Sequence, residues 1–142
     1  MALKLKIQKI HEEAVIPFFA HEGDAALDLF SVQKITLEPG ERWAIPTGIA
    51  MEIPKGYVGL VWDKSGLSMN HGLKTLGGVI DATYRGEVMV GMINLGSKAY
   101  TFEKGNKVAQ MIIQKREGVI IKEIKKLTET KRGKGGFGST GL

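Results

Sequence analysis

The segment GGVIDATYRGE, residues 77–87, places a carboxylate where it could activate a water molecule. Asp81 follows two β-branched residues, Val79 and Ile80, and precedes a predicted bend, so its side chain is expected at a strand end. An aspartate with an ordinary pKa of about 3.9 is ionised at neutral pH and can orient and deprotonate a water. The position is equally typical of a turn-forming aspartate. The segment alone leaves both interpretations open.

The segment DKSGLSMNHG, residues 63–72, combines features suited to a phosphate group. A strand, a Ser-Gly pair and the start of a short helix would direct backbone N–H groups and the Ser65 hydroxyl towards one point, beside the charge of Lys64. The glycine spacing of a P-loop is missing. Ser65 as the N-cap of a helix explains the same residues equally well.

Two further polar side chains lie within apolar runs. Asp28, in GDAALDLFS, needs a partner there, either a lysine or arginine or a hydrated metal ion. Gln110, in KVAQMIIQ, is either an outward-facing strand residue or a ligand-binding amide, and its segment alone favours the first. The three histidines show no metal-ligand spacing and are assigned no role.

The segment RGKGGFGSTG, residues 132–141, is half glycine and contains one aromatic residue, Phe137. Ordering ten residues costs on the order of 10–20 kcal/mol of backbone entropy, and glycine loses the most. One large apolar side chain does not offset that cost. We therefore expect this segment to be mobile when no ligand is bound, and the segment alone leaves open whether it is a frayed end or an arm that closes on a ligand.

These residues need a scaffold, and the sequence predicts one made of strands. The first apolar residues alternate with polar ones, which is typical of a half-buried strand. Further strand candidates are KITL, RWAI, IAMEI, YVGLVW, EVMVGMINL, KVAQMIIQ and VIIKEI. Gly- and Pro-bearing turns separate them, a pattern that favours a barrel or a sandwich. One short helix is expected, around Ser65 to Asn70.

Length and composition limit the classes of protein. A chain of 142 residues is the size of one domain. It has no cysteine, hence no disulfide or thiolate site, and no long apolar run or signal-peptide core, so we expect a cytoplasmic protein without a membrane partner. The formal charge of +5 is uneven: from Lys125 onward five basic residues face one acid, whereas the rest of the chain is nearly neutral. A basic tail favours an anionic partner.

Taken in order, the five segments resemble the five motifs of the trimeric dUTPases, the dUTP pyrophosphatases. GDAALDLFS, DKSGLS, GGVIDATYRGE, GNKVAQM and RGKGGFGSTG span residues 23–141, and the third and fifth are long enough to be specific. The resemblance implies an all-β, jelly-roll-like antiparallel barrel over residues 1–125, a flexible arm over residues 126–142 that closes the active site, and a homotrimer with shared sites. The resemblance favours a catalytic role for Asp81 over a turn-forming one. It likewise favours ligand binding by Ser65, Gln110 and the glycine-rich tail over their structural interpretations.

The resemblance also implies the reaction, a Mg²⁺-dependent hydrolysis of dUTP to dUMP and pyrophosphate by water attack on the α-phosphorus. This reaction limits uracil incorporation into DNA and supplies dUMP for thymidylate synthesis. By similarity Asp81 is the catalytic residue that activates the water, and the ring of Tyr84 excludes a ribose 2′-hydroxyl. Backbone groups of Gly78, Val79 and Ile80 would bind the uracil edge.

The other motifs are implied to bind the triphosphate and the metal. Lys64, Ser65, Gly66 and Gln110 would face the phosphates, and Asp28 would place Mg²⁺ indirectly, through its waters. Phosphoryl transfer depends mainly on such positioning and charge neutralisation. The arm would stack Phe137 on the uracil. The other arm residues expected to bind substrate are Arg132, Gly138, Ser139 and Thr140.

Three positions depart from the usual family pattern. Lys64 stands where an arginine is usual and lacks its bidentate fork. Ala26 replaces a glycine, and Thr75 replaces an asparagine that in many relatives helps to hold the pyrimidine. Two alternatives stay open: a dCTP deaminase or bifunctional relative of the same superfamily, and a non-enzymatic nucleotide- or nucleic-acid-binding barrel. The near-neutral body disfavours a stable nucleic-acid partner.

Overall fold

A computed structural model describes residues 2–141, and within that range the chain forms ten strands and one helix. All the strand pairs are antiparallel, so the predicted all-β antiparallel class is confirmed. The strands are β1 (Lys6–Lys9), β2 (Leu27–Phe30), β3 (Ile35–Leu37), β4 (Arg42–Glu52), β5 (Tyr57–Trp62), β6 (Leu73–Leu76), β7 (Val79–Asp81), β8 (Glu87–Asn94), β9 (Tyr100–Phe102) and β10 (Lys107–Lys115).

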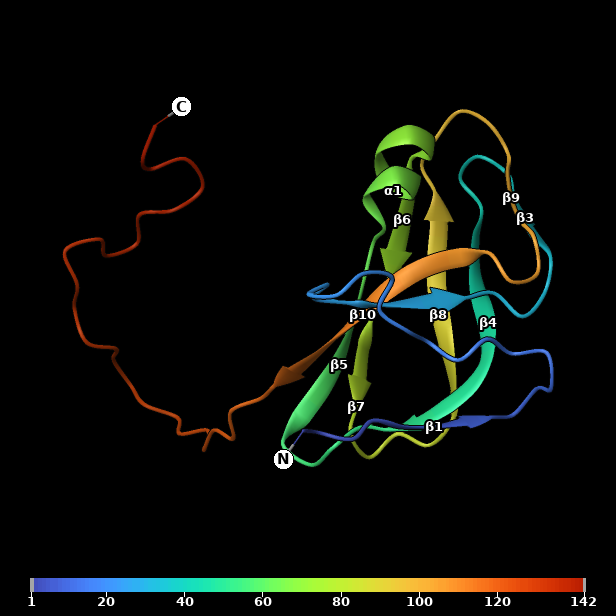
Figure 1. Ribbon diagram of the computed structural model, residues 1–142. Coiled ribbons are helices and arrows are strands. Elements are labelled where there is room, and N and C mark those ends of the chain that lie inside the picture. Colours follow the sequence, from blue (N-terminus) through green and yellow to red (C-terminus); the bar gives the residue numbers. More distant parts are fainter. Residues whose placement is uncertain (1, 142) are drawn as a thin grey trace.

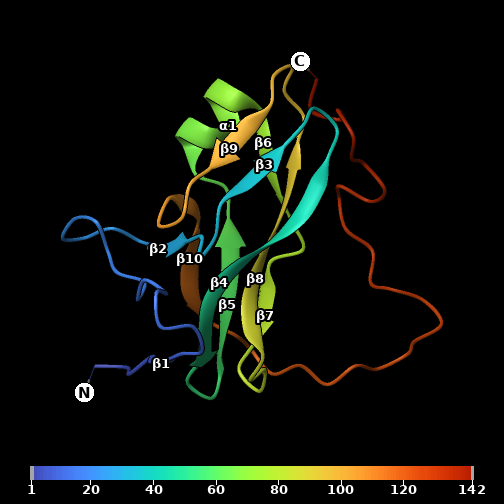
Figure 2. The same cartoon turned by 90° about the vertical axis from the view of Figure 1, so that its right-hand side faces the viewer.

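The strands form two four-stranded sheets, ordered β1-β4-β8-β6 and β2-β10-β5-β7, and a small sheet of β3 and β9. The two larger sheets lie against each other around one interior (Figures 1 and 2). Alternate residues of their strands point inward and are apolar, which joins all three sheets in one core. Its largest fully buried apolar side chains are Phe102, Leu29, Leu37, Ile45, Ile49, Leu73, Met92 and Met111.

An irregularity in β4 fixes the start of β8. The register between these strands shifts between Pro46 and Ala50, where proline cannot donate to the ladder. Gly48 has a φ of 69°, and a Cβ there would lie 2.9–3.0 Å from three side chains, so only glycine fits. Its N–H donates to Glu87 Oε1 at 2.8 Å. The carboxylate of Glu87 thereby anchors the end of the β7–β8 connection, which carries the third motif.

The helix α1 (Ser65–His71) follows β5 after a two-residue connection. It ends at Gly72, which adopts the left-handed conformation with φ 71°. A Cβ on Gly72 would lie 2.6 Å from the Gly96 nitrogen, so the turn requires glycine. The predicted helix is confirmed and extends one residue further than expected. Within residues 2–141 no helix is both long and apolar enough to cross a membrane.

The last strand ends at Lys115, and residues 116–141 are irregular and almost entirely exposed. The predicted strand VIIKEI, residues 119–124, is therefore wrong, although its composition favours a strand. No sheet edge of the described chain pairs with it, and Ile120 and Ile121 are 98% and 93% exposed. The segment runs away from the barrel (Figure 1).

Candidate functional site

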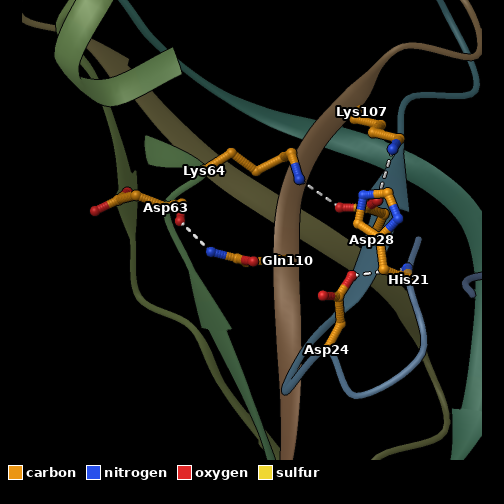
Figure 3. A network of polar contacts seen from close by, with 7 residues as sticks. All are labelled: His21, Asp24, Asp28, Asp63, Lys64, Lys107 and Gln110. Atoms are coloured by element: carbon orange, nitrogen blue, oxygen red, sulfur yellow. Dashed lines mark hydrogen bonds and ion pairs between the residues drawn. The ribbon is translucent and has the colours of Figure 1, made fainter. Parts of the chain in front are cut away.

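Three of the predicted phosphate-side residues lie around one hollow. Asp28 in β2, Lys64 after β5 and Gln110 in β10 line a cavity of about 530 Å³. These elements are adjacent because β10 pairs with both β2 and β5. Residues 82 positions apart in the sequence thus meet in one place, as the ordered motifs require (Figure 3).

The carboxylate of Asp28 is the most deeply buried charge in this hollow, with a side chain only 5% exposed. Lys64 Nζ donates to its Oδ1 at 2.5 Å, and Lys107 Nζ forms an ion pair with its Oδ2 at 2.8 Å. Burial would raise the pKa of Asp28, but the contacts with Lys107 and Lys64 outweigh burial and hold the pKa below its ordinary value. The predicted need for a cationic partner is met by two lysines.

Asp63 and Lys64 of the second motif line this hollow, whereas Ser65 and Gly66, at the start of α1, are not among its lining residues. Lys64 occupies the N-cap position with extended backbone angles, and no side chain caps this helix end. Ser65 is the first helical residue, so the interpretation of Ser65 as the N-cap is wrong. Its hydroxyl is not used as a cap. A Cβ on Gly66 would meet nothing within 4 Å, so this glycine borders open space.

Gln110 is oriented by a backbone carbonyl. Its Nε2 donates to the Asp63 oxygen at 2.7 Å (Figure 3). Because a carbonyl only accepts, this contact determines which end of the amide is the nitrogen. One N–H of the amide remains for a ligand in the hollow.

The third motif begins with a turn and the short strand β7, which lies against β5, whereas β6 and β8 belong to the other four-stranded sheet. β7 pairs with β5, and the carbonyl of Gly78 accepts a hydrogen bond from Val61 N at 2.8 Å. Gly78 has a φ of 111°, and a Cβ there would lie 2.9 Å from the Val61 oxygen, so the close approach requires glycine. Ile80 is half-buried, and Val79 is 67% exposed. Asp81 ends the strand and is exposed.

Tyr84 packs over a glycine beside Asp81. Its N–H donates to the Asp81 carbonyl at 3.0 Å, and its hydroxyl donates to the Glu87 carbonyl at 2.9 Å. A Cβ on Gly86 would lie 2.4 Å from the Tyr84 oxygen, so any side chain at that position displaces the ring. A second hollow of about 170 Å³ is lined by Val79, Ile80, Asp81, Tyr84, Glu87 and Met89.

Asp81 and the phosphate-side residues face the same side of one sheet. Gln110 lies opposite Trp62 of β5, and Asp81 lies opposite Val58 of the same strand. Val58 precedes Trp62 by four residues. Directly paired residues, and residues an even number apart, share a face. Four residues correspond to roughly 13 Å along the strand. The two groups therefore face the same way without being in contact.

Thr75 lies in β6 and is buried, 8% exposed. Both its N–H and its hydroxyl donate to Asp63 Oδ1, at 2.6 and 2.8 Å. Thr75, Gly78 and Val79 line a third hollow of about 170 Å³, with Trp62 between it and the phosphate side. The predicted contact of Thr75 with the base stays a prediction.

The structure does not bring the fifth motif to any of these hollows. Phe137 is fully exposed and has a φ of 49°, and Arg132 Nε donates within the arm, to the Gly135 carbonyl at 2.9 Å. Gly138, Ser139 and Thr140 are exposed as well. Their predicted roles stay predictions.

A larger hollow of about 650 Å³ lies elsewhere, between β4 and β8. Its lining includes Trp43, Pro46 and Met89 and contains no carboxylate. Because it lacks an acid–base group and a metal ligand, it is a poorer candidate for the active site despite its size.

The residues present fit a metal ion held through water. In residues 2–141 no three acidic, histidine or cysteine side chains gather closely enough to form a direct cage. Asp28 Oδ2 lies 2.8 Å from Lys107 Nζ in an ion pair and accepts no other hydrogen bond from the described residues. A carboxylate oxygen has lone pairs for more than one donor, so Oδ2 has capacity for a metal-bound water as well, and Mg²⁺ commonly keeps several waters.

Comparison with known proteins decides the family. A family model described as dUTPase matches residues 12–141. The chain belongs to the dUTPase family. It is 50% identical over 141 residues to the deoxyuridine 5′-triphosphate nucleotidohydrolase of Clostridium kluyveri, covering 98% of this chain and 99% of that protein. For the same enzyme of Clostridium novyi the identity is 49% over 142 residues, with 99% and 100% covered.

Solved dUTPase structures share the fold. A variant dUTPase of Staphylococcus bacteriophage 80alpha with dUpNHpp matches with a TM-score of 0.92 at 28% identity, covering 99% of this chain and 100% of that chain. A variant dUTPase from phage phi11 of S. aureus, described for its coordination of a structural Mg(II) ion, matches with a TM-score of 0.81 at 28% identity. The match covers 87% of this chain and 98% of that chain. The predicted family, jelly-roll-like fold and dUTP-hydrolysing activity are confirmed, and the deaminase alternative is not favoured.

Sequence reasoning missed three residues that support the site. Lys107 lies within GNKVAQM and receives no role from the sequence, yet it forms an ion pair with Asp28. Asp63 directly precedes Lys64 and receives no role either, yet it contacts both β6 and β10. Gly86 makes room for Tyr84. An unassigned charge within a motif was the available signal for the first two, whereas the third depends on a ring position that no sequence shows.

Proposed function

We propose that this dUTPase-family protein hydrolyses dUTP to dUMP and pyrophosphate with Asp81 as the residue that activates the attacking water. The observation that carries the assignment is the exposed carboxylate at the end of β7, beside Tyr84. An exposed carboxylate can accept a proton from water, and a neighbouring ring limits which sugar fits. The backbone groups of Gly78, Val79 and Ile80 would bind the uracil edge.

The triphosphate would lie in the hollow with Lys64, Ser65, Gly66 and Gln110. Lys64 and Lys107 supply positive charge there, and Gln110 keeps one free N–H. Catalysis of phosphoryl transfer is mainly positioning and charge neutralisation, which these groups can provide.

We propose Mg²⁺ as the metal, with Asp28 as its indirect ligand. When bound, Mg²⁺ would neutralise phosphate charge and orient the triphosphate. Asp28 is ionised and buried, and each of its two oxygens contacts one lysine, which leaves lone pairs for metal-bound water. The two lysines keep the carboxylate from being an isolated buried charge.

We propose that the arm over residues 126–142 closes the site, with Phe137 stacked on the uracil. Base–aromatic stacking contributes about 1–3 kcal/mol in other proteins. Arg132, Gly138, Ser139 and Thr140 would meet the phosphates through charge, hydroxyl and backbone N–H groups. The exposure of the Phe137 ring and the course of residues 126–141 away from the barrel (Figure 1) suit a segment that orders on its ligand.

We propose a homotrimer in which neighbouring chains share each site. Ile120 and Ile121 expose apolar side chains that a partner chain would cover. The separation of Asp81 from the phosphate side, across one sheet, also suits sites shared between chains. A mass measurement in solution tests the proposal, and a monomer at micromolar concentration would contradict it. The expected cytoplasmic location stays a prediction.

Product analysis tests the function. The protein is incubated with Mg²⁺ and, separately, dUTP, dCTP, dTTP and UTP, and the products are identified by chromatography. We expect rapid formation of dUMP and pyrophosphate from dUTP alone. Deamination of dCTP, or equal hydrolysis of all four nucleotides, would refute the proposal.

A further inference from the structure

Asp63 connects three segments of the site through four hydrogen bonds. Its Oδ1 accepts from the N–H and the hydroxyl of Thr75, and its Oδ2 accepts from Lys74 Nζ at 2.7 Å. Its backbone carbonyl accepts from Gln110 Nε2 (Figure 3). One residue between β5 and α1 thus contacts both β6 and β10.

The Asp63 clamp, meaning Asp63 with its contacts to Thr75 and Gln110, is partly shielded from water. The Asp63 side chain is 23% exposed. Burial would raise the pKa of Asp63, but the hydrogen bonds from Lys74 and Thr75 outweigh burial and lower it. Asp63 is therefore ionised at neutral pH, and hydrogen bonds to an ionised acceptor are shorter and stronger than those between neutral groups.

The segments that the clamp joins are those that would bind the two ends of the nucleotide. Asp63 directly precedes Lys64, Ser65 and Gly66, the proposed phosphate-binding residues, which are called the phosphate segment and of which the last two begin α1. Thr75 precedes the turn into Gly78 to Ile80, the uracil segment, which the Val61 contact holds against β5. A shift of the Asp63 backbone would move the phosphate segment and the Gln110 amide together.

We propose that Asp63 is a positioning residue for nucleotide binding, which holds the phosphate segment, Gln110 and the uracil segment in register. Thr75 then acts through Asp63, because its hydroxyl proton is already donated to that carboxylate. The inference rests on the proposed dUTP site and extends it to Asp63, which would act without touching the substrate, and to the two hydrogen bonds that Asp63 accepts from Thr75. It differs from simple structural support, which would affect stability without affecting substrate affinity.

Three variants and one control test this proposal by steady-state kinetics with dUTP. Asp63→Ala removes all side-chain contacts, Asp63→Asn keeps an acceptor for Thr75, and Thr75→Val removes only the hydroxyl. Thr36→Val is the matched control, since it removes a threonine–threonine hydrogen bond of 2.8 Å between β3 and β9, away from the site. Circular dichroism checks that each variant is folded.

We expect Asp63→Ala to raise KM for dUTP about tenfold, as for loss of hydrogen bonds to a charged group, while kcat changes less. Asp63→Asn and Thr75→Val should give smaller increases, and Thr36→Val none. Calorimetry should show that Asp63→Ala weakens binding of both dUMP and inorganic pyrophosphate, because both ends of the site lose their register.

A folded Asp63→Ala variant with a wild-type KM would overturn the inference. If that variant does not fold, wild-type KM values for both Asp63→Asn and Thr75→Val would overturn it, and raised values would support it. A wild-type protein that does not hydrolyse dUTP would instead refute the proposed function. The two failures are therefore distinguishable.

Discussion

The Lys64 ammonium donates a hydrogen bond to the Asp28 carboxylate, 2.5 Å away, so the proposed phosphate-binding cation and the proposed metal-side acid are in direct contact. Lys107 holds the other oxygen of the same carboxylate. Substrate and metal would therefore be recognised by one charge cluster. In this cluster the negative Asp28 lies between the positive Lys64 and Lys107. Such an arrangement suits a positive metal ion bound to a negative triphosphate.

Replacing Lys64 tests the charge on the phosphate side. Lys64→Met is expected to raise KM for dUTP roughly ten- to a hundredfold, because a hydrogen bond to a charged group contributes about 1.5–3 kcal/mol. Lys64→Arg keeps the charge and should stay within about threefold of wild type. Steady-state kinetics at saturating Mg²⁺ measures both. A wild-type KM in the Lys64→Met variant would show that Lys64 does not contribute to dUTP binding.

Replacing Asp81 tests the proposed base. Asp81→Asn keeps the size of the side chain but cannot accept the proton, so kcat is expected to fall about 10²–10⁴-fold. Binding of a non-hydrolysable dUTP analogue, measured by calorimetry, should change little. Glu103→Gln, which neutralises an exposed acid in another turn, serves as the control. Normal turnover by Asp81→Asn would show that another group activates the water.

Replacing Gly86 tests the position of the Tyr84 ring. The Cβ of Gly86→Ala would lie 2.4 Å from the tyrosine oxygen, so the ring must move away. We expect discrimination between dUTP and UTP to fall about tenfold, because the ring no longer limits the sugar pocket. Gly118→Ala is the control, since its Cβ meets nothing within 4 Å. Unchanged discrimination in a folded Gly86→Ala variant would contradict the role given to Tyr84.

Removing the arm tests the proposed closure. Deletion of residues after Lys131 should leave the unfolding midpoint within about 2 °C, because the barrel loses no buried contact, but should reduce turnover severely. Phe137→Ala separates stacking from the rest of the arm and should raise KM roughly ten- to a hundredfold. Full activity of the truncated protein would refute closure by the arm.

The acid dependence of stability tests the ionised state of Asp63. Its pKa in the folded protein is lowered, so ionised Asp63 stabilises the fold above its ordinary pKa of about 3.9, and this contribution is lost as the pH falls through the lower folded-state value. Asp63→Asn cannot titrate. The difference in free energy of unfolding between wild type and Asp63→Asn, measured with urea, should therefore shrink below about pH 4. A difference that is constant with pH would contradict the lowered pKa.

Local patterns predicted the strands and helix that carry the motifs, because alternation and turn residues act over a few neighbours. The short strands β6 and β9 escaped notice, since three or four residues show too little period. The error at residues 119–124 has the opposite cause: a strand needs a partner as well as a composition. The contacts of Lys107 and Asp63 depend on which strands pair, and pairing is not visible in any one segment.

The exposed stretch of residues 116–141 makes this protein vulnerable to loss of activity without loss of fold. Proteases cut extended, accessible segments, and this one contains Lys125, Lys126, Lys131, Arg132 and Lys134. A single cut at any of these residues would remove Phe137 and leave the barrel and its melting temperature intact. The mass of the intact chain is therefore a better test of an active preparation than a melting curve.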